Sequence, residues 1–425
     1  MKVIVLGAGV IGVSSAWYLS QLGHDVVVVD RQPAAGRETS FANGAQVSVS
    51  QSEPWAAPSA PLKVIKWLFK EDAPLLFRPQ LDWQQLSWCL EFLVECLPSR
   101  YRVNIQQTVN LGLYSRESLQ TLRASTGIEY DHGTRGIMQF YTDEADYAGA
   151  AAACALMSQY GIQRRVLDRD EAIRVEPALA SLGTKLKGAS YAESDESGDA
   201  FKFTQNLAKL AEANGVKFRY DTAVAALRKD GDRISGVVVK GKDSVTYDAL
   251  SADAYVVCLG SYSTPMLKTI GISIPVYPAK GYSATLDTEG FIGAPQMSLT
   301  DEAMKIVFTP IGNRLRIAGT AELAGYNTDI NMVRCEALIK RARELFPTAA
   351  DYNRPQYWTG LRPSTPSNRP LIGRANFANL YLNTGHGTLG WTEGPGSGRA
   401  IADLVSGKVP EVDYRFLNVD GRKPQ

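Results

Sequence analysis

The feature that most constrains this chain is a glycine-rich turn near its start, Gly7-Ala8-Gly9-Val10-Ile11-Gly12. Before it, Val3 to Leu6 has the composition of a short buried strand, and after it Gly12 to Gln21 has the apolar spacing of a helix. Asp25 to Asp30 (DVVVVD) then has the pattern of a second buried strand. A strand, a glycine turn, a helix and a strand in close succession predict a βαβ unit, and hence a parallel sheet.

The spacing of the glycines, GxGxxG, is typical of a dinucleotide site. Gly7 permits the tight turn, Gly9 lets a pyrophosphate approach the backbone, and Gly12 lets the helix pack closely on the strand. The phosphates are expected at the helix N-terminus, at Val10 and Ile11, where free N–H groups and the helix dipole favour anions. A glycine turn without a ligand is the alternative, but the flanking strand and helix favour the dinucleotide.

Asp30 strengthens this prediction, because it ends the second strand 18 residues after Gly12. A carboxylate in that position can accept hydrogen bonds from both ribose hydroxyls. From there the strand and helix alternation of an NAD-type fold stops, and a polar loop runs from Ala34 to Ser52. Such a loop suits a pyrophosphate, a ribityl chain and a flavin edge, so we predict FAD, against the alternative of an ordinary solvated loop. The loop contacts that we predict are Arg31, Thr39, Ser40, Asn43 and Gln46.

A second strand, glycine loop and helix lies near the C-terminus, in NLYLNTGHGTLGWTEGPGSGRAIADLV. A positive helix end beside the flavin would stabilise the anionic reduced form and raise its affinity for a hydride. We expect His386 to orient the cofactor by hydrogen bonding rather than to act as an acid or base. The cofactor contacts predicted here are Gly385, His386, Gly387, Thr388 and Leu389, with Val224 and Gly260 from two intervening segments of nucleotide-fold character (VKFRYDTAV and ADAYVVCLG).

The order of these segments predicts an α/β fold with a discontinuous Rossmann-type FAD-binding domain and an inserted, mostly antiparallel α+β substrate domain. We assign residues 1–55, 190–274 and 350–425 to the FAD-binding domain, and 56–189 and 275–349 to the substrate domain. Residues from about Pro275 to Thr320 alternate in the manner of antiparallel strands. The stretch from Pro61 to Thr126 is predicted to be helical, in short and bent pieces because prolines punctuate it.

Composition excludes several classes of function. Lys and Arg total 45 against 44 Asp and Glu, so no overall charge favours nucleic acid. The 5 cysteines lack metal-binding spacing and the 3 histidines are far apart, so we predict no metal site and no Ser/His/Asp triad. No secretory signal and no apolar stretch long enough to span a bilayer is evident, so we expect a cytoplasmic protein, with the cytoplasmic face of the inner membrane as the alternative.

Five separated motifs together identify a resemblance: GxGxxG, ETSFANGAQ, KGYS, TGLRPSTPSNRPLIG and NTGHGTLGWT. In this order they closely resemble the small subunit of bacterial D-amino acid dehydrogenase, within the superfamily of FAD-dependent D-amino acid oxidase and glycine oxidase. The resemblance runs from Met1 to about Val405. Two positions depart from the family pattern: Ser367 stands where an acidic residue is usual, and Glu393 stands where small and sulfur-containing residues are usual.

The resemblance implies oxidative deamination of D-amino acids to 2-oxo acids and ammonia, by hydride transfer from the α-carbon to flavin N5. The D configuration comes from the resemblance alone. An amino acid also brings a carboxylate that a guanidinium can clamp through two hydrogen bonds. We assign that clamp to Arg362, in an extended segment bracketed by prolines, and a second donor to the same carboxylate to Tyr282. The neutral amine assists hydride loss, so no strong protein base is needed.

Two other functions fit the same motifs. The first is an FAD enzyme for a secondary amine, such as D-proline, a hydroxyproline or an N-substituted glycine, with O2 as acceptor. The second is a flavin-binding subunit that is not catalytic by itself. A basic amphipathic segment, PSAPLKVIKWLFK from Pro58 to Lys70, would allow peripheral contact with a membrane and delivery of electrons to a quinone. Its alternative is a helix over the active site with its lysines in solvent.

Overall fold

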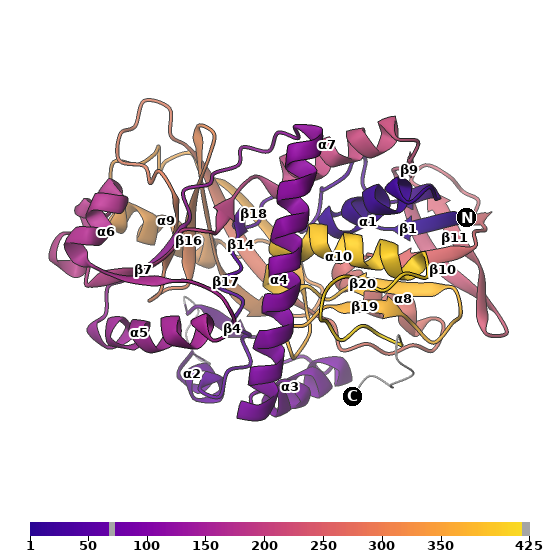
Figure 1. Cartoon of the computed structure of the whole chain (residues 1–425), viewed down its shortest axis with the longest axis horizontal. Helices are drawn as coiled ribbons and strands as arrows, with labels where there is room; N and C mark the ends of the chain where they lie inside the picture. Colours follow the sequence, from indigo (N-terminus) through magenta and orange to yellow (C-terminus); the bar gives the residue numbers. More distant parts are fainter. Residues whose placement is uncertain (68–72, 419–425) are drawn as a thin grey trace.

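The computed structural model describes residues 1–67 and 73–418. Two large sheets organise it, and the long helix α4 (Pro98–Thr126) runs across the junction between them (Figure 1). The other helices are α1 (Val10–Gln21), α2 (Ala60–Trp67), α3 (Trp83–Glu95), α5 (Glu144–Ser158), α6 (Arg169–Val175), α7 (Ala200–Ala213), α8 (Ser263–Lys268), α9 (Met332–Leu345) and α10 (Gly390–Val405), with short 3-10 segments η1 (Pro177–Lys185), η2 (Gly260–Tyr262) and η3 (Gly387–Leu389).

The first sheet has six strands in the order β19-β20-β13-β1-β2-β9 and is parallel except for the pair β19 and β20. Its strands are β1 (Lys2–Leu6), β2 (Asp25–Val29), β9 (Lys217–Arg219), β13 (Ala254–Val257), β19 (Leu371–Arg374) and β20 (Leu380–Thr384). Apolar runs such as VIVL in β1 suit a sheet that is covered on both faces. One face packs on α1, α7 and α10, and the other packs on the small antiparallel sheet of β10 (Thr222–Asp230), β11 (Arg233–Gly241) and β12 (Asp248–Leu250).

The second sheet has nine strands and is mostly antiparallel. Its strands, in chain order, are β4 (Leu75–Phe77), β5 (Ile137–Tyr141), β6 (Arg165–Asp168), β7 (Gly188–Ala192), β14 (Tyr277–Asp287), β15 (Ser298–Asp301), β16 (Ile306–Ile311), β17 (Arg314–Leu323) and β18 (Gln356–Ser364). Helix α9 and the η1 region close a separate hydrophobic core over it. A short ribbon of β3 (Gln46–Val47) and β8 (Glu196–Ser197) lies outside both sheets. The predicted α/β class and the inserted antiparallel sheet are confirmed.

One detail of the prediction is wrong. The stretch after Pro61 is not made of short pieces throughout, because α4 has 29 residues. Its only proline, Pro98, stands at the first position of the helix, where the missing N–H costs nothing. The predicted domain bounds stay a prediction; the strands β7 and β18 belong to the nine-stranded sheet, so the chain crosses between sheets after Ala192 and after Ser364. We propose those crossings as the domain boundaries.

Candidate active site

A cavity of about 1390 Å³ lies between the two sheets. Its lining includes the glycine turn and Asp30 as well as Arg362 and Tyr282. Every residue predicted to bind the cofactor or the substrate lines it, except Gly12 and Gly385. A single cavity thus brings together the predicted dinucleotide site, the polar loop and the predicted carboxylate clamp.

At the nucleotide end, the two inner glycines have different roles. A Cβ atom on Gly12 would lie 1.9 Å from the Gly7 carbonyl oxygen, so Gly12 serves helix packing and does not line the cavity. A Cβ atom on Gly9 would meet only the Ser40 hydroxyl, at 3.5 Å, which leaves this backbone open to a close ligand. Gly9 gives α1 no side-chain cap, although Ser40 Oγ accepts from the Val10 N–H at 3.0 Å. The N-terminus of α1 therefore lines the cavity, where the free N–H groups of a helix start favour an anion.

Asp30 is held in place by hydrogen bonds from two backbone N–H groups, one of them in the glycine turn. Its two carboxylate oxygens accept from the backbone N–H of Ala8, at 2.6 Å, and of Gln32, at 2.8 Å. Burial raises the pKa of Asp30 above its ordinary value, while those two hydrogen bonds oppose the rise. A fixed carboxylate beside the glycine turn is the arrangement that a ribose diol requires.

Two residues predicted to contact the cofactor, Arg31 and Thr39, are held at the cavity by contacts with other segments and with the loop itself. Arg31 pairs with Glu38, with Nε 2.6 Å from Oε1, and its guanidinium stacks on the ring of Tyr262. Thr39 Oγ1 donates to the carbonyl of Leu361, at 2.9 Å, and so joins the loop to the strand that carries Arg362. Glu38 and Tyr262 were not predicted as contacts: Glu38 begins the ETSFANGAQ motif but was not singled out, and Tyr262 belongs to none of the motifs.

The C-terminal glycine loop follows β20 and opens into η3 and α10, as predicted. Gly385 and Gly387 have positive φ angles of 87° and 53°, which turn the chain sharply between the strand and the helix. Gly385 lies against Thr365 and Val276 and not in the cavity, so its role is in the turn alone. His386 is buried, and neither ring nitrogen has a partner among the described residues. Burial lowers its pKa to about 3, so the imidazole is neutral near pH 7.

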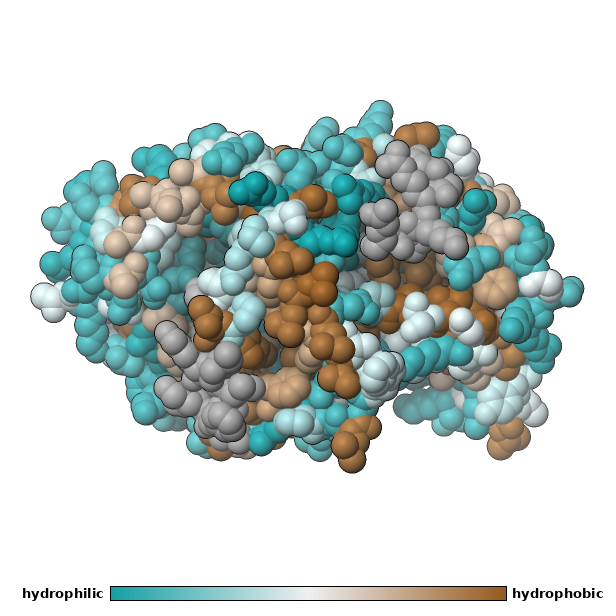
Figure 2. All heavy atoms as spheres, turned by 90° about the horizontal axis from the view of Figure 1, so that it is seen from below, coloured by the Kyte–Doolittle hydropathy of each residue, from teal (hydrophilic) through white to brown (hydrophobic). Residues whose placement is uncertain are grey.

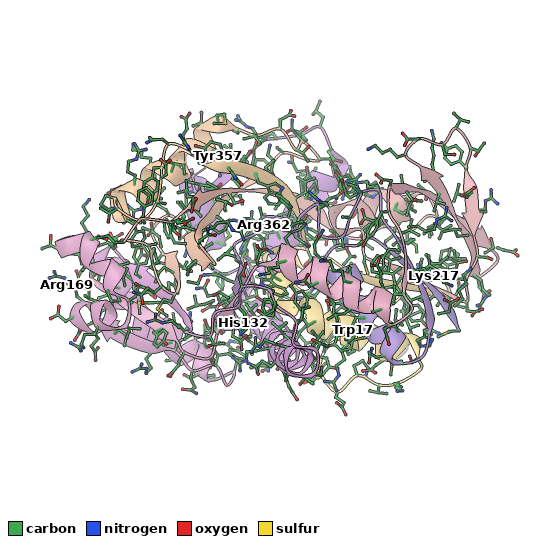
Figure 3. The ribbon with its side chains drawn as sticks, turned by 90° about the horizontal axis from the view of Figure 1, so that it is seen from above. Trp17, His132, Arg169, Lys217, Tyr357 and Arg362 are labelled. Atoms are coloured by element: carbon green, nitrogen blue, oxygen red, sulfur yellow. The ribbon has the colours of Figure 1, made fainter. Side chains whose placement is uncertain are left out.

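Arg362 enters the cavity from β18, near the middle of the molecule, whereas Tyr357 lies farther out on the same strand (Figure 3). Its guanidinium lies flat on Gly281 of β14, where an added Cβ atom would be 2.3 Å from Cζ. Nη1 donates to the Thr320 carbonyl, at 3.0 Å, and no carboxylate among the described residues forms an ion pair with it. Burial, with a smaller contribution from Arg334, lowers the pKa of Arg362 to about 10, so the group stays charged at neutral pH. Arg362 therefore places a fixed positive charge at the cavity, and such a charge can bind an anion.

Tyr282 requires a correction. Its ring lines the cavity, but its hydroxyl donates to Glu322 Oε2, so the proton is not directed at a substrate. Glu322 is buried beside Lys280, whose Nζ lies 3.4 Å from Oε2, and burial together with Glu322 raises the pKa of Tyr282. We therefore revise its predicted role from direct donor to a support on β14, next to the Gly281 platform of Arg362.

These features fit FAD. The turn is open at Gly9, Asp30 supplies a fixed carboxylate, and His386, a buried histidine without a partner in the described part of the chain, directly precedes η3. The cavity is larger than the roughly 300–1,000 Å³ of ordinary small-molecule pockets, as a dinucleotide and a second substrate together require. Within residues 1–67 and 73–418, no group of three or more His, Cys, Asp or Glu side chains could hold a metal ion.

Several cavity residues were missed by sequence reasoning. They come from β5, β15, the turn before β16, and α5 with its following loop: Gln139, Tyr141, Thr300, Glu302, Lys305 and Arg164. Arg164 pairs with Glu53, with Nη2 2.6 Å from Oε1, across a sequence separation of 111. No local signal marks such residues, because only the pairing of distant strands brings them to the cavity.

Glu393, the departure noted in α10, is fully buried with no partner for either carboxylate oxygen among the described residues. Burial raises its pKa well above the ordinary value. Because burial raises the pKa of Glu393, this residue makes the free energy of unfolding depend on pH.

The other departure, Ser367, accepts the Arg369 N–H at 3.3 Å and closes a local turn.

The sign of the pH dependence due to Glu393 follows from linkage. A raised pKa means that the folded state holds a proton that the unfolded state loses above about pH 4.3, so stability falls as pH rises until the folded pKa is passed. Glu393→Gln should remove that loss, with a gain that grows by about 1.4 kcal/mol per pH unit in this range. Urea unfolding between pH 4 and 9 measures it, with the exposed Glu289→Gln as control. A gain that did not vary with pH would contradict the prediction.

Among helices of the described part of the chain, none is both long enough and apolar enough to cross a membrane.

A family model described as DAO, FAD dependent oxidoreductase, matches residues 2–404. A D-amino acid dehydrogenase of Dechloromonas aromatica is 53% identical over 417 residues, covering 98% of this chain and 100% of the relative. Among solved structures, glycine oxidase from Bacillus cereus aligns with a TM-score of 0.72 and 22% identity, over 96% of this chain and 95% of the other. An L-proline dehydrogenase from P. horikoshii aligns with a TM-score of 0.73 and 16% identity, over 96% and 94%.

Proposed function

Because the chain belongs to the FAD dependent oxidoreductase (DAO) family, we propose that it oxidises free D-amino acids at the α-carbon, with FAD as cofactor. The substrate loses two electrons and two protons to become an imino acid, which water hydrolyses to a 2-oxo acid and ammonia. The observation that carries the proposal is Arg362, a charged guanidinium in the cavity without a carboxylate partner in the described part of the chain.

The residues around the cavity divide the work of this reaction. We propose that the α1 N-terminus and Asp30 hold the nucleotide, and that the polar loop and the start of α10 hold the flavin. Bound FAD supplies the acceptor for the hydride. Arg362 holds the substrate carboxylate and thereby orients the α-carbon, and the surrounding protein excludes water. His386 is neutral and buried, so it supplies a fixed dipole and no proton.

The D configuration rests on the relative at 53% identity, which is named D-amino acid dehydrogenase. The fold does not choose between configurations, because an L-proline dehydrogenase shares it. Which face of the α-carbon meets the acceptor depends on the side chains that line the cavity. High sequence identity to a relative bears on those side chains, whereas a shared fold does not.

Anaerobic mixing of the FAD-loaded chain with single amino acids tests the proposal. D-amino acids should bleach the flavin absorbance, with one 2-oxo acid and one ammonia formed per flavin reduced, while their L-enantiomers should not. Faster bleaching by D-proline, hydroxyproline or an N-substituted glycine would transfer the function to secondary amines. No bleaching by any amine would make the chain a non-catalytic flavin subunit.

We propose further that the acceptor of the flavin electrons is a membrane quinone rather than O2, and that α3 docks on the bilayer. This helix exposes large apolar side chains along one side although its other side is buried: Trp83, Leu86, Leu90, Leu93 and Val94, flanked by Leu81 and Leu97. Hydrophobic residues gather near the middle of the face that is seen from below, the side where α2 and α3 lie (Figure 1 and Figure 2). Contiguous exposed apolar surface of this kind marks an interaction site.

Its position and its rim favour a lipid surface. The cavity extends to Phe92 of α3 and Val64 of α2, so a lipophilic acceptor would enter from the docked side. Arg100 and Arg102 lie near the start of α4, which follows α3, and Lys268 contacts Gln84 of α3, with Nζ 3.2 Å from Oε1. Of the predicted segment Pro58–Lys70, α2 covers Ala60–Trp67, and residues 68–70 lie outside the described residues.

Changing Leu86, Leu90 and Leu93 together to Gln should lower binding to anionic phospholipid vesicles at least about tenfold, because each leucine loses its apolar burial in lipid. Reduction of a water-soluble dye with a D-amino acid should be unchanged. The matched control is Val245→Gln, an exposed apolar residue on the opposite domain. Wild-type chain that stays in the supernatant with vesicles at low salt would refute the docking surface.

A further inference from the structure

Three consecutive backbone carbonyls of the polar loop are held by side chains of the nine-stranded sheet. Ser283 Oγ of β14 donates to the carbonyl of Ala42 at 2.7 Å, and Arg316 Nη1 of β17 donates to that of Asn43 at 2.9 Å. Thr309 Oγ1 of β16 donates to that of Gly44 at 2.8 Å. The loop is pressed close to the sheet, since a Cβ atom on Gly44 would lie 2.9 Å from a Val307 methyl group.

This arrangement sets the direction of the loop's amides. In a trans peptide the N–H points away from the preceding carbonyl. Carbonyls of Ala42 and Asn43 that point into the sheet therefore turn the N–H groups of Asn43 and Gly44 away from it, and both residues line the cavity. At Ala45 the chain takes a positive φ of 58°, which a non-glycine residue adopts only when its surroundings enforce it.

Arg316 is the distinctive member of the three. It is 4% exposed, and Nε also donates to Thr285 Oγ1 at 2.8 Å. No carboxylate among the described residues lies within ion-pair distance of it, whereas its neighbour Arg314 pairs with Asp199 at 3.1 Å. Burying a guanidinium whose hydrogen bonds go to one hydroxyl and one loop carbonyl costs desolvation free energy. A contribution to folding stability alone therefore does not explain Arg316.

The same two strands also hold the substrate clamp. Thr320, four residues beyond Arg316 on β17, presents its carbonyl to Arg362. Gly281, two residues before Ser283 on β14, supports the Arg362 guanidinium and shares a face with Ser283. The β14–β17 ribbon therefore fixes the separation between the carboxylate clamp and the loop, over roughly 13 Å of strand.

We propose, on the basis of the proposed function, that Arg316 is a positioning residue. Assisted by Ser283 and Thr309, it holds the backbone carbonyls of residues 42–44 and thereby sets the position of the flavin relative to the substrate bound to Arg362. The residue touches neither flavin nor substrate and acts through the loop. Misplacement of reacting groups by about 1 Å costs up to about 100-fold in rate, so loss of this contact should appear in the rate of flavin reduction rather than in substrate binding.

The test compares Arg316→Met with Arg314→Met, which removes a charge of the same sign from the same strand without touching the loop. In anaerobic stopped-flow with a D-amino acid, R316M should lower the limiting rate of flavin reduction about 10- to 100-fold and change the substrate dissociation constant less than about threefold. R316M should also alter the visible flavin spectrum and raise the FAD dissociation constant, whereas R314M should match the wild type in all four measurements.

A wild-type spectrum and reduction rate in R316M would overturn the proposal, as would equal losses in R314M. If R316M does not fold, the double variant S283A/T309V removes the two other carbonyl contacts without disturbing a charge, and the same changes of smaller size are expected. If no D-amino acid reduces the wild-type flavin, the proposed function fails. The FAD dissociation constant and the spectrum then still decide the role of Arg316, because neither needs a substrate.

Discussion

Replacing Arg362 with Gln should raise the apparent KM for a D-amino acid at least about 100-fold while FAD stays bound. Two hydrogen bonds to a charged group are lost, each worth about 1.5–3 kcal/mol, and about 1.4 kcal/mol corresponds to tenfold in affinity. The buried setting adds to this, because the substrate carboxylate would enter the cavity without a counter-charge. Steady-state kinetics with a dye acceptor gives KM, and the flavin absorbance of the purified variant reports FAD.

Two further substitutions test the assignment of the Arg362 clamp independently. Arg362→Lys keeps the charge but not the planar fork, so its KM should fall between those of wild type and R362Q. Gly281→Ala should raise KM without touching Arg362 itself, since the new methyl group would displace the guanidinium. The exposed Arg354→Gln is the control. A KM in R362Q within about threefold of wild type would refute the assignment of the clamp.

Gly12→Ala should abolish FAD binding or folding of the nucleotide domain. The added methyl carbon would sit 1.9 Å from the Gly7 carbonyl oxygen, and because that atom belongs to the backbone, it yields only if α1 moves away from β1. Such a movement opens the turn and displaces the N–H groups at the start of α1. We expect an increase of at least about 100-fold in the FAD dissociation constant, or insoluble protein.

The matched control for this change is Gly241→Ala in β11. Its methyl group would meet only Ser244 Cβ, at an ordinary 3.5 Å, far from the turn. FAD titration monitored by quenching of flavin fluorescence, together with far-ultraviolet circular dichroism, separates loss of binding from loss of fold. A Gly12→Ala chain that bound FAD as the wild type does would show that the turn can relax, and the packing argument would fail.

The half of the fold that could be predicted is the half built from local sequence. The motif from Gly7 to Gly12 predicts a turn, a helix and a parallel strand because all of their contacts close within about thirty residues. The antiparallel alternation after Pro275 is likewise visible in the chain itself, and β14, β16 and β17 confirm it. The prolines before Pro98 misled the prediction of helix length, because none follows Pro98 inside α4.

The candidate site was predictable only as a set of residue types. Arg362 stood out as a guanidinium in a proline-bracketed segment, and it lines the same cavity as the glycine turn. Tyr282 was a candidate only through its KGYS motif, and its proton goes to Glu322, which is 40 residues away in sequence and follows a shift in the register of β14 against β17. A shift of one residue changes which side chains meet, and no local pattern specifies it.

By itself, the sequence determined the cofactor class, and it predicted where the dinucleotide binds and which cation holds a carboxylate, because short-range spacing and composition carry those properties. Only the tertiary structure decided how the parts face one another: Arg316 reaches Asn43 across 273 positions, and Thr320 reaches Arg362 across 42. Hydride transfer depends on such distances between groups that different strands supply. The register of strand pairing sets these distances, and register is fixed by the packing of the whole sheet rather than by any one segment.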